Sequence, residues 1–342
     1  MKYNWHRDLP DRRDKIYAFA DDDDGENPDP CVTKVDLRPH CPPVYDQGRL
    51  GSCTANAIAG AFEYNELVQF SKNPVTPSRL FLYYNERRAE GTINSDSGAS
   101  LRDGMKSINR VGICPETIWA YDIDKFTTQP PLECYNIAAF YRAIVYTRVQ
   151  QELAHLRKCL EDNHPIVCGV AVYDSFESDE VKKTGRVPMP DDSESQLGGH
   201  AILLVGYDDT QECFTFRNSW GEAWGDAGYG TLSYQYVLDP GLTSDFWIIE
   251  KVIEPAAPEP APEPAPEPNS GHDNDVHSDD GDETKSAYVE SNAPKPVSSG
   301  SGSDSESESK SQENPDKIRV SDVYGDNEPG HATERKSNAW FS

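Results

Sequence analysis

Only the part of this 342-residue chain before about residue 255 has enough apolar residues to bury a core. From residue 254 a Pro-Ala-Glu repeat begins, and the remaining sequence is dominated by Ser, Asp, Glu and Asn. Such a composition cannot offset conformational entropy by burying apolar surface, and the Pro-rich repeat favours an extended stalk. We expect three parts: an N-terminal extension, 1–34, forming a short pro-segment or loop; one folded domain, 35–250; and a stalk with a disordered acidic tail, 251–342.

The charge balance limits the kinds of partner. The formal net charge is -27, and acidic residues outnumber basic ones both before and after residue 250. A protein that binds nucleic-acid phosphates needs a basic surface that releases counterions, and no basic stripe is evident in this sequence. We therefore expect no nucleic-acid partner.

The N-terminal sequence and the cysteines bear on the cellular compartment in which the protein is expected. The chain begins MKYNWHRD, without the apolar run of a secretory signal, and no later window approaches 18 apolar residues. The eight cysteines contain no C-x-x-C pair, so we expect reduced, mostly buried thiols and no metal site or cofactor. These features predict no membrane association and a reducing compartment: the cytoplasm or, if the protein is viral, the virion or host cytoplasm.

The period of the apolar residues changes along the domain. The first half shows helical spacing, which predicts helices at 52–72, 77–90 and 99–110. The second half has short runs rich in Val, Ile, Phe and Tyr, which predict strands at 166–173, 201–207, 213–218, 229–232 and 246–249. Helices followed by antiparallel strands favour an α+β domain in two halves, and a cleft between two such halves is a common place for a ligand site.

Cys53 lies at the start of the first predicted helix, in the segment YDQGRLGSCTA at 45–55. The positive end of a helix dipole, with its unpaired N–H groups, favours thiolate over thiol, and a nucleophile needs the thiolate. An isolated cysteine, in contrast, is usually a small buried apolar side chain. Cys53 is therefore a candidate nucleophile whose assignment depends on the surrounding motifs.

Four segments together resemble those of the papain family of cysteine peptidases. The segment that holds Gln47 and Cys53 resembles the family's nucleophile segment, and VDLR at 35–38 resembles the start of its mature enzymes. GHAILLVGY at 199–207 and NSWG at 218–221 resemble its histidine and asparagine segments. The order and the approximate spacing agree with the family pattern, and slightly long separations are consistent with surface insertions.

The resemblance implies a papain-like fold of two subdomains: a helical half, an antiparallel β-barrel-like half and an active-site cleft between them. It implies a cysteine endopeptidase in which Cys53 is the nucleophile, His200 the base and acid, Asn218 the residue that orients the imidazole, and Gln47 an oxyanion-hole donor. Taken singly, the histidine would be typical of a hydrogen-bonded core residue and the asparagine of a turn.

The resemblance also implies substrate contacts and partners. Gly98 and Ala99 would pair with the peptide on the acyl side, the Gly199 carbonyl would accept from the residue at the bond, and Trp220 would cover the His–Asn contact. A loop before a helix is the alternative reading of the first pair. The implied partners are a peptide or protein substrate and cystatin-like inhibitors, and we expect a monomer.

Departures from the family pattern define a subgroup. Leu50 replaces a usual disulfide cysteine and Thr54 a usual tryptophan, and together with Trp5 and LPDRRD at 9–14 they resemble papain-like enzymes of bacteria and large DNA viruses. The 34 residues before the mature start are too few for the long helical inhibitory propeptide of lysosomal relatives, so control of activity is unexplained. Two alternatives stay open: an acyl-transfer enzyme (a peptide ligase or transpeptidase), and a non-catalytic papain-fold binding protein.

Overall fold

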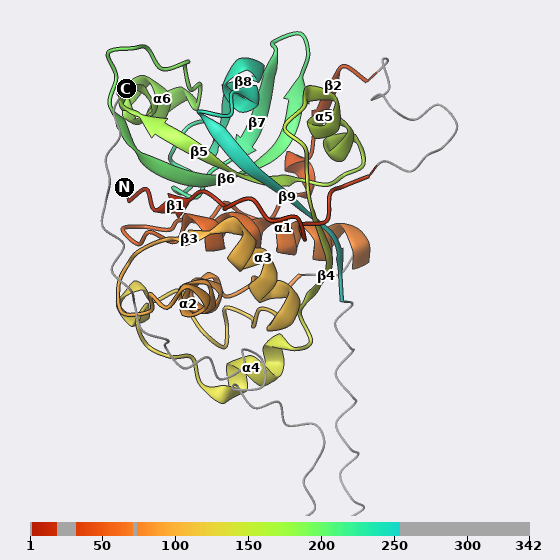
Figure 1. Cartoon of the computed structure of the whole chain (residues 1–342), viewed down its shortest axis with the longest axis vertical. Coiled ribbons are helices and arrows are strands. Elements are labelled where there is room, and N and C mark those ends of the chain that lie inside the picture. Colours follow the sequence, from red (N-terminus) through yellow and green to blue (C-terminus); the bar gives the residue numbers. More distant parts are fainter. Residues whose placement is uncertain (1, 19–31, 71–73, 254–342) are drawn as a thin grey trace, which may run out of the picture. The chain divides into compact units, whose positions relative to one another are not determined.

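The computed structural model describes residues 2–18, 32–70 and 74–253. Residues 19–31 of the predicted N-terminal extension and the predicted stalk and tail from residue 254 lie outside these ranges. Within the described part, a helical half lies below a mainly antiparallel sheet in the view of Figure 1. The predicted boundaries of the N-terminal extension, the folded domain and the tail stay a prediction.

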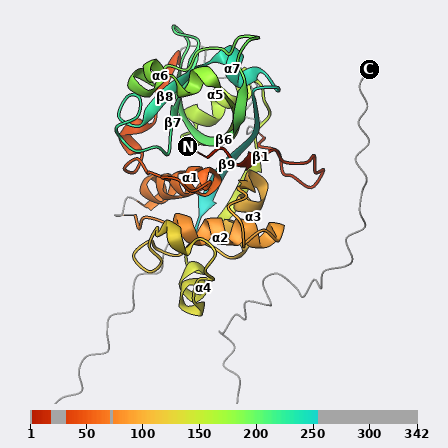
Figure 2. The ribbon, with the colours of Figure 1, turned by 90° about the vertical axis from the view of Figure 1, so that its left-hand side faces the viewer.

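Three longer helices form the helical half: α1 (Cys53–Phe70), α2 (Arg79–Glu90) and α3 (Leu101–Arg110). They confirm the three predicted helices to within two residues at each start. Ser78 caps α2 by accepting a hydrogen bond from the Phe81 N–H, and Ser100 caps α3 in the same way. The first helix contacts both α2 and the sheet, and Figures 1 and 2 show it between them.

Several short elements of three to nine residues were not predicted, because their sequences carry too little periodicity to identify. They are η1 (Arg38–His40), η2 (Ile123–Lys125), α4 (Leu132–Ala138), β4 (Ala143–Arg148), α5 (Leu153–Glu161), η3 (Asp174–Glu177), α6 (Asp179–Thr184) and α7 (Tyr234–Leu238).

The sheet has the strand order β4-β9-β5-β6-β7-β8, and β2 also pairs with β6. All its pairs are antiparallel. Its further strands are β2 (Lys34–Asp36), β5 (Ile166–Tyr173), β6 (Gln196–Asp208), β7 (Cys213–Arg217), β8 (Tyr229–Ser233) and β9 (Thr243–Val252). No pairing among the described strands joins β4 to β8, so the half expected to be barrel-like is a sheet that does not close.

One hydrophobic core joins the helical half to the sheet. Ile58 and Phe62 of α1 belong to the same buried cluster as Val167, Leu203 and Ile248 of the strands. Burying each such side chain stabilises the fold by about 1.5–3 kcal/mol relative to leaving it exposed. The start of α1 is therefore held firmly against β6, where the candidate histidine lies.

The N-terminal residues lie between the two halves. Strand β1 (Trp5–His6) pairs in parallel with β3 (Ala99–Ser100), and Asn4 forms a parallel bridge with Gly199. Figure 1 shows this segment in dark red crossing between the sheet and the helices. We call residues 2–8 the N-terminal strap.

Polar contacts hold the strap at both ends. At one end, Lys2 forms a 2.5 Å ion pair with Asp96. At the other end Asp8 is buried: its N–H donates to Asp245 (2.7 Å), and its carboxylate accepts from the Trp247 indole (2.9 Å). Burial and the neighbouring Asp245 raise the pKa of Asp8 to about 6. The strap is thus built into the domain as a structured element.

Two further features concern membrane-spanning helices and the state of the cysteines. Among the described residues, no helix is both long enough and apolar enough to cross a membrane. The seven cysteines in the same ranges are free thiols, five of them buried.

Candidate active site

The candidate nucleophile is the first residue of α1 and is fully buried. The backbone N–H groups of Ala201 on β6, of Asn4 in the strap and of Thr54 lie near the Cys53 sulfur and act to lower its pKa. The contact with Ala201, which follows the candidate histidine, brings the start of the helix and the histidine strand together. The sulfur therefore lies at the junction of the helical half, the sheet and the strap.

The candidate histidine and asparagine form the predicted contact. His200 Nε2 lies 2.9 Å from Asn218 Oδ1, which also accepts from the Ser219 N–H at 2.8 Å. Because the amide oxygen accepts, Nε2 carries the proton, and Nδ1 is left free to take one. Nδ1 is buried and has no hydrogen-bond partner among the described residues. The ring of Trp220 packs over the imidazole, with centroids 4.8 Å apart and an interplanar angle of 30°.

The candidate oxyanion donor is fixed by three contacts. Gln47 is fully buried; its Oε1 accepts from the Ser219 hydroxyl (2.6 Å) and its N–H donates to the Ser219 carbonyl (2.8 Å). One hydrogen of its Nε2 goes to the Leu50 carbonyl (3.0 Å), so the second remains for a ligand. Sequence reasoning missed Ser219, which links the oxyanion donor to Asn218, although its place within the NSWG segment could have indicated a role.

Burial sets the protonation of the pair. It raises the pKa of the Cys53 thiol to about 11, and the backbone N–H groups of Ala201, Asn4 and Thr54 oppose this only in part. It also lowers the pKa of His200 to about 4, against the raising effect of Asn218. The expectation that the helix N-terminus favours thiolate is therefore not met in this state, because burial outweighs the N–H groups and leaves both groups neutral at pH 7.

The predicted substrate-binding backbone is occupied by the chain itself. Trp5 pairs with Ala99 and Asn4 with Gly199, while a Cβ on Gly98 would lie only 1.6 Å from the Asn4 carbonyl oxygen. Nearer the chain's start, the Tyr3 ring of the strap meets His200 and Trp220 edge-on, at centroid distances of 6.2 and 5.9 Å. The strap thus lies along the surface where a peptide was predicted to bind, a position that sequence reasoning did not anticipate.

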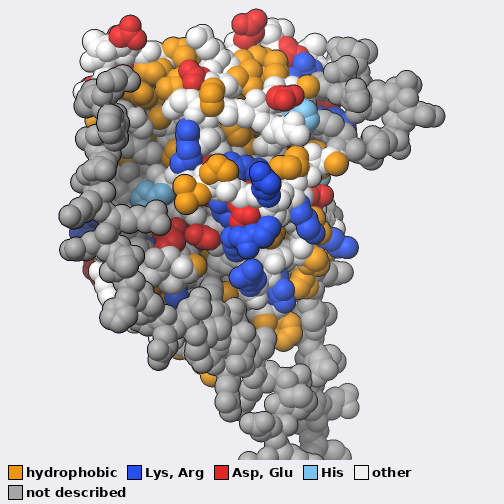
Figure 3. All heavy atoms as spheres, in the orientation of Figure 1, with side chains coloured by type: hydrophobic (Ala, Val, Ile, Leu, Met, Phe, Trp, Pro, Cys, Tyr) orange, Lys and Arg blue, Asp and Glu red, His pale blue; other side chains and the backbone are white. Residues whose placement is uncertain are grey.

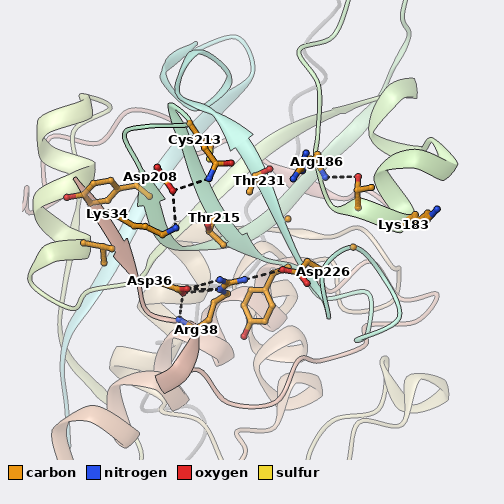
Figure 4. Close-up of a pocket in the computed structure, with 17 residues that line it drawn as sticks. Lys34, Asp36, Arg38, Lys183, Arg186, Asp208, Cys213, Thr215, Asp226 and Thr231 are labelled. Atoms are coloured by element: carbon orange, nitrogen blue, oxygen red, sulfur yellow. Dashed lines mark hydrogen bonds and ion pairs between the residues drawn. The ribbon is translucent and has the colours of Figure 1, made fainter. Parts of the chain in front are cut away.

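Two other hollows are polar and contain none of the candidate residues. The cavity in Figure 4, of about 430 Å³, holds Lys34 paired with Asp208 and Arg38 paired with Asp36 and Asp226. Figure 3 shows Lys and Arg side chains gathered over α3. There, a hollow of about 350 Å³ is lined by Asp11 and Asp14 together with Arg13, Lys15, Lys106 and Arg110.

The sequence analysis did not predict this cluster of Lys and Arg side chains, because its residues come from two segments far apart in the chain. The hollow also contains Asp11 and Asp14, so its lining carries both signs of charge. The expectation of no nucleic-acid partner stays a prediction. Within the described ranges, no group of three or more His, Cys, Asp and Glu side chains could hold a metal ion.

Comparison with known proteins agrees with the fold and the motifs. Residues 31–245 match the papain family of cysteine proteases. The chain belongs to this family, and it is a cysteine peptidase, a hydrolase.

Its relatives match the subgroup indicated by the sequence. An uncharacterised peptidase C1-like protein of Acanthamoeba polyphaga mimivirus is 44% identical over 232 residues, which cover 66% of this chain and 75% of that protein. The crystal structure of xylellain, a cysteine protease from Xylella fastidiosa, superposes with a TM-score of 0.66 and 40% identity over 72% of this chain and 95% of that one. Digestive procathepsin L 3 of Tenebrio molitor (TM-score 0.52, 20% identity, 65% of this chain and 71% of that one) shares the fold.

Proposed function

We propose that the chain is an endopeptidase that hydrolyses peptide bonds through a thioester on Cys53. The observation that carries this proposal is the His200–Asn218 contact at 2.9 Å beside a buried thiol at a helix N-terminus. The contact fixes the imidazole in the tautomer whose free nitrogen can take the thiol proton. All four catalytic candidates, Cys53, His200, Asn218 and Gln47, have side chains suited to their proposed roles, which favours catalysis over a role in binding alone.

The reaction begins when a peptide replaces the strap in the cleft. The thiol proton moves to His200 Nδ1, and the sulfur attacks the scissile carbonyl carbon. The resulting oxyanion accepts hydrogen bonds from the Cys53 N–H and Gln47 Nε2. As the C–N bond breaks, the imidazolium gives its proton to the leaving amine. Neutral His200 then takes a proton from water, which attacks the thioester carbon. The C–S bond breaks, the acid product leaves, and the imidazolium returns its proton to the Cys53 sulfur.

Product analysis tests hydrolysis against acyl transfer. We expect an unstructured protein incubated with the purified full chain to be cut internally, with new carboxyl termini carrying one oxygen from water, as intact-mass analysis in H₂¹⁸O would show. An added amine should capture only a minor fraction. Predominant amide products would establish the transferase alternative, loss of terminal residues alone would indicate an exopeptidase, and Cys53→Ala should give no products.

Replacing Gln47 with alanine tests the oxyanion hole. We expect turnover to fall by about 10²- to 10³-fold with little change in KM, because the amide stabilises charge that develops only in the transition state. Steady-state kinetics on a short peptide would measure this. Gln235→Ala, which removes the same amide from an exposed position on α7, is the matched control. A Gln47→Ala enzyme with unchanged turnover would show that another group holds the oxyanion.

A further inference from the structure

One arginine next to the candidate oxyanion hole is almost completely buried. Arg79 is the first residue of α2, and its side chain is 9% exposed. The guanidinium carbon lies 4.6 Å from the centre of the Tyr45 ring and 4.0 Å from that of Tyr121. Two of its nitrogens donate to the carboxylate of Glu116, at 2.9 and 3.0 Å. Because burying an arginine is costly unless its charge and its N–H groups are satisfied, these contacts hold the guanidinium in one place.

The third nitrogen of the guanidinium connects the two segments that carry the oxyanion donors. Nη1 donates to the carbonyl of Asp46 (3.3 Å), the residue before Gln47, and to the side-chain oxygen of Asn56 (3.0 Å). Asn56 donates in turn from Nδ2 to the carbonyl (2.9 Å) and the hydroxyl (3.1 Å) of Ser52, the residue before Cys53. One nitrogen is therefore linked by hydrogen bonds to the residue that precedes each donor.

Tyr121 bridges the same two segments. Its hydroxyl donates to the Gln47 carbonyl (3.0 Å) and lies 2.5 Å from the Ser52 hydroxyl. Its ring lies against the guanidinium, so the arginine supports this bridge as well. The Ser219 contacts join Gln47 to the chain that follows β7, whereas the bridge joins it to the start of α1.

We propose that Arg79 is a positioning residue for the reaction: it sets the separation between the Gln47 amide and the Cys53 N–H, the two donors of the oxyanion hole. The inference rests on the proposed function, because an oxyanion forms only if a carbonyl is attacked. It goes further by assigning a share of transition-state stabilisation to a buried side chain on α2. Donors of this kind act when each lies about 2.7–3.1 Å from the oxyanion, so a small displacement weakens both.

Comparing hydrolysis with alkylation distinguishes positioning from general stability. Iodoacetamide reacts when the Cys53 sulfur displaces iodide, a step that forms no oxyanion, whereas peptide hydrolysis needs the oxyanion hole. We expect Arg79→Met in the full chain to lower turnover of a short peptide by about 10- to 100-fold, with KM and the alkylation rate within about threefold of wild type. Arg79→Lys should lose nearly as much turnover, because an ammonium group keeps the charge but not the planar fork of donors.

A second variant tests the network without removing a buried charge. Tyr121→Phe removes only the hydroxyl that bridges the two segments, and we expect turnover to fall about 10-fold with unchanged alkylation. In a Gln47→Ala background the same change should cost less than about threefold, because the donor that it positions is already absent. Arg49→Met is the matched control: its side chain is 76% exposed in its pair with Asp124, so turnover should stay within about twofold of wild type.

The outcomes separate this inference from the proposed function. Variants that are folded by thermal unfolding and hydrolyse like wild type would overturn the inference and leave the proposed function standing. Equal losses of hydrolysis and alkylation would also overturn it, because the arginine would then only maintain the domain. If Arg79→Met does not fold, Tyr121→Phe decides. A wild-type chain that is alkylated at Cys53 but hydrolyses no peptide would refute the proposed function, and this inference with it.

Discussion

Replacing Cys53 with alanine is expected to reduce peptide hydrolysis by about 10⁶-fold, to the limit of detection, because a nucleophile that acts as a unit with its base cannot be partly replaced. His200→Ala should cost a similar factor, and the double variant should be no slower than either single one. Steady-state turnover of a short peptide by the purified full-length variants would measure this.

Cys213→Ala provides the matched control for loss of a thiol. This cysteine is a free thiol on β7, half-buried and outside the catalytic cluster, so its removal should leave turnover within a few-fold of wild type. If Cys53→Ala kept wild-type turnover in pure protein, the nucleophile would have to be another group. If the falls in turnover of the two single variants multiplied in the double variant, Cys53 and His200 would not act as one unit.

The catalytic cluster could be predicted because each of its members lies within a short local motif. A cysteine at a helix start, a histidine on a strand and an asparagine directly after the end of the next strand are local features. The fold then brings them together through β6 and β7, which pair directly. The long helices and the strands β5, β7 and β8 were predictable for the same reason, since their apolar periods extend over five or more residues.

The strap could not be predicted, because its position depends on non-local contacts. Strand β1 has only two residues, which is too short for any period, and its partner β3 lies more than 90 residues away. The protonation of Cys53 was misjudged for a related reason. The helix N-terminus was visible in the sequence, but the strap that helps bury the sulfur was not.

The strap also offers an answer to how activity is controlled. The strap lies across the predicted substrate site, with Trp5 paired at Ala99 and the Tyr3 ring beside Trp220. The backbone N–H of Asn4 lies near the Cys53 sulfur and lowers its pKa in part, so the strap helps to bury the thiol.

Opening the strap should uncover the thiol. We expect Trp5→Ala to raise the rate of Cys53 alkylation by iodoacetamide at pH 7 by roughly 10- to 100-fold, the effect of losing about 1.5–3 kcal/mol of aromatic burial on the open population. The closed state has a Cys53 pKa of about 11 and a His200 pKa of about 4, both set chiefly by burial. Opening relieves burial, which lowers the first pKa and raises the second, so alkylation should begin at lower pH.

A control within the same segment separates opening from general destabilisation. Leu9 follows the strap directly and its side chain is 80% exposed, so Leu9→Ala removes apolar atoms that are not packed in the cleft. It should leave both the alkylation rate and its pH limb unchanged. The measurement is the second-order labelling rate from pH 5 to 10 by intact mass, alongside peptide turnover, which should rise with it in Trp5→Ala. A Trp5→Ala protein that labels and turns over like wild type would mean that the strap leaves the cleft readily, and that activity is controlled elsewhere.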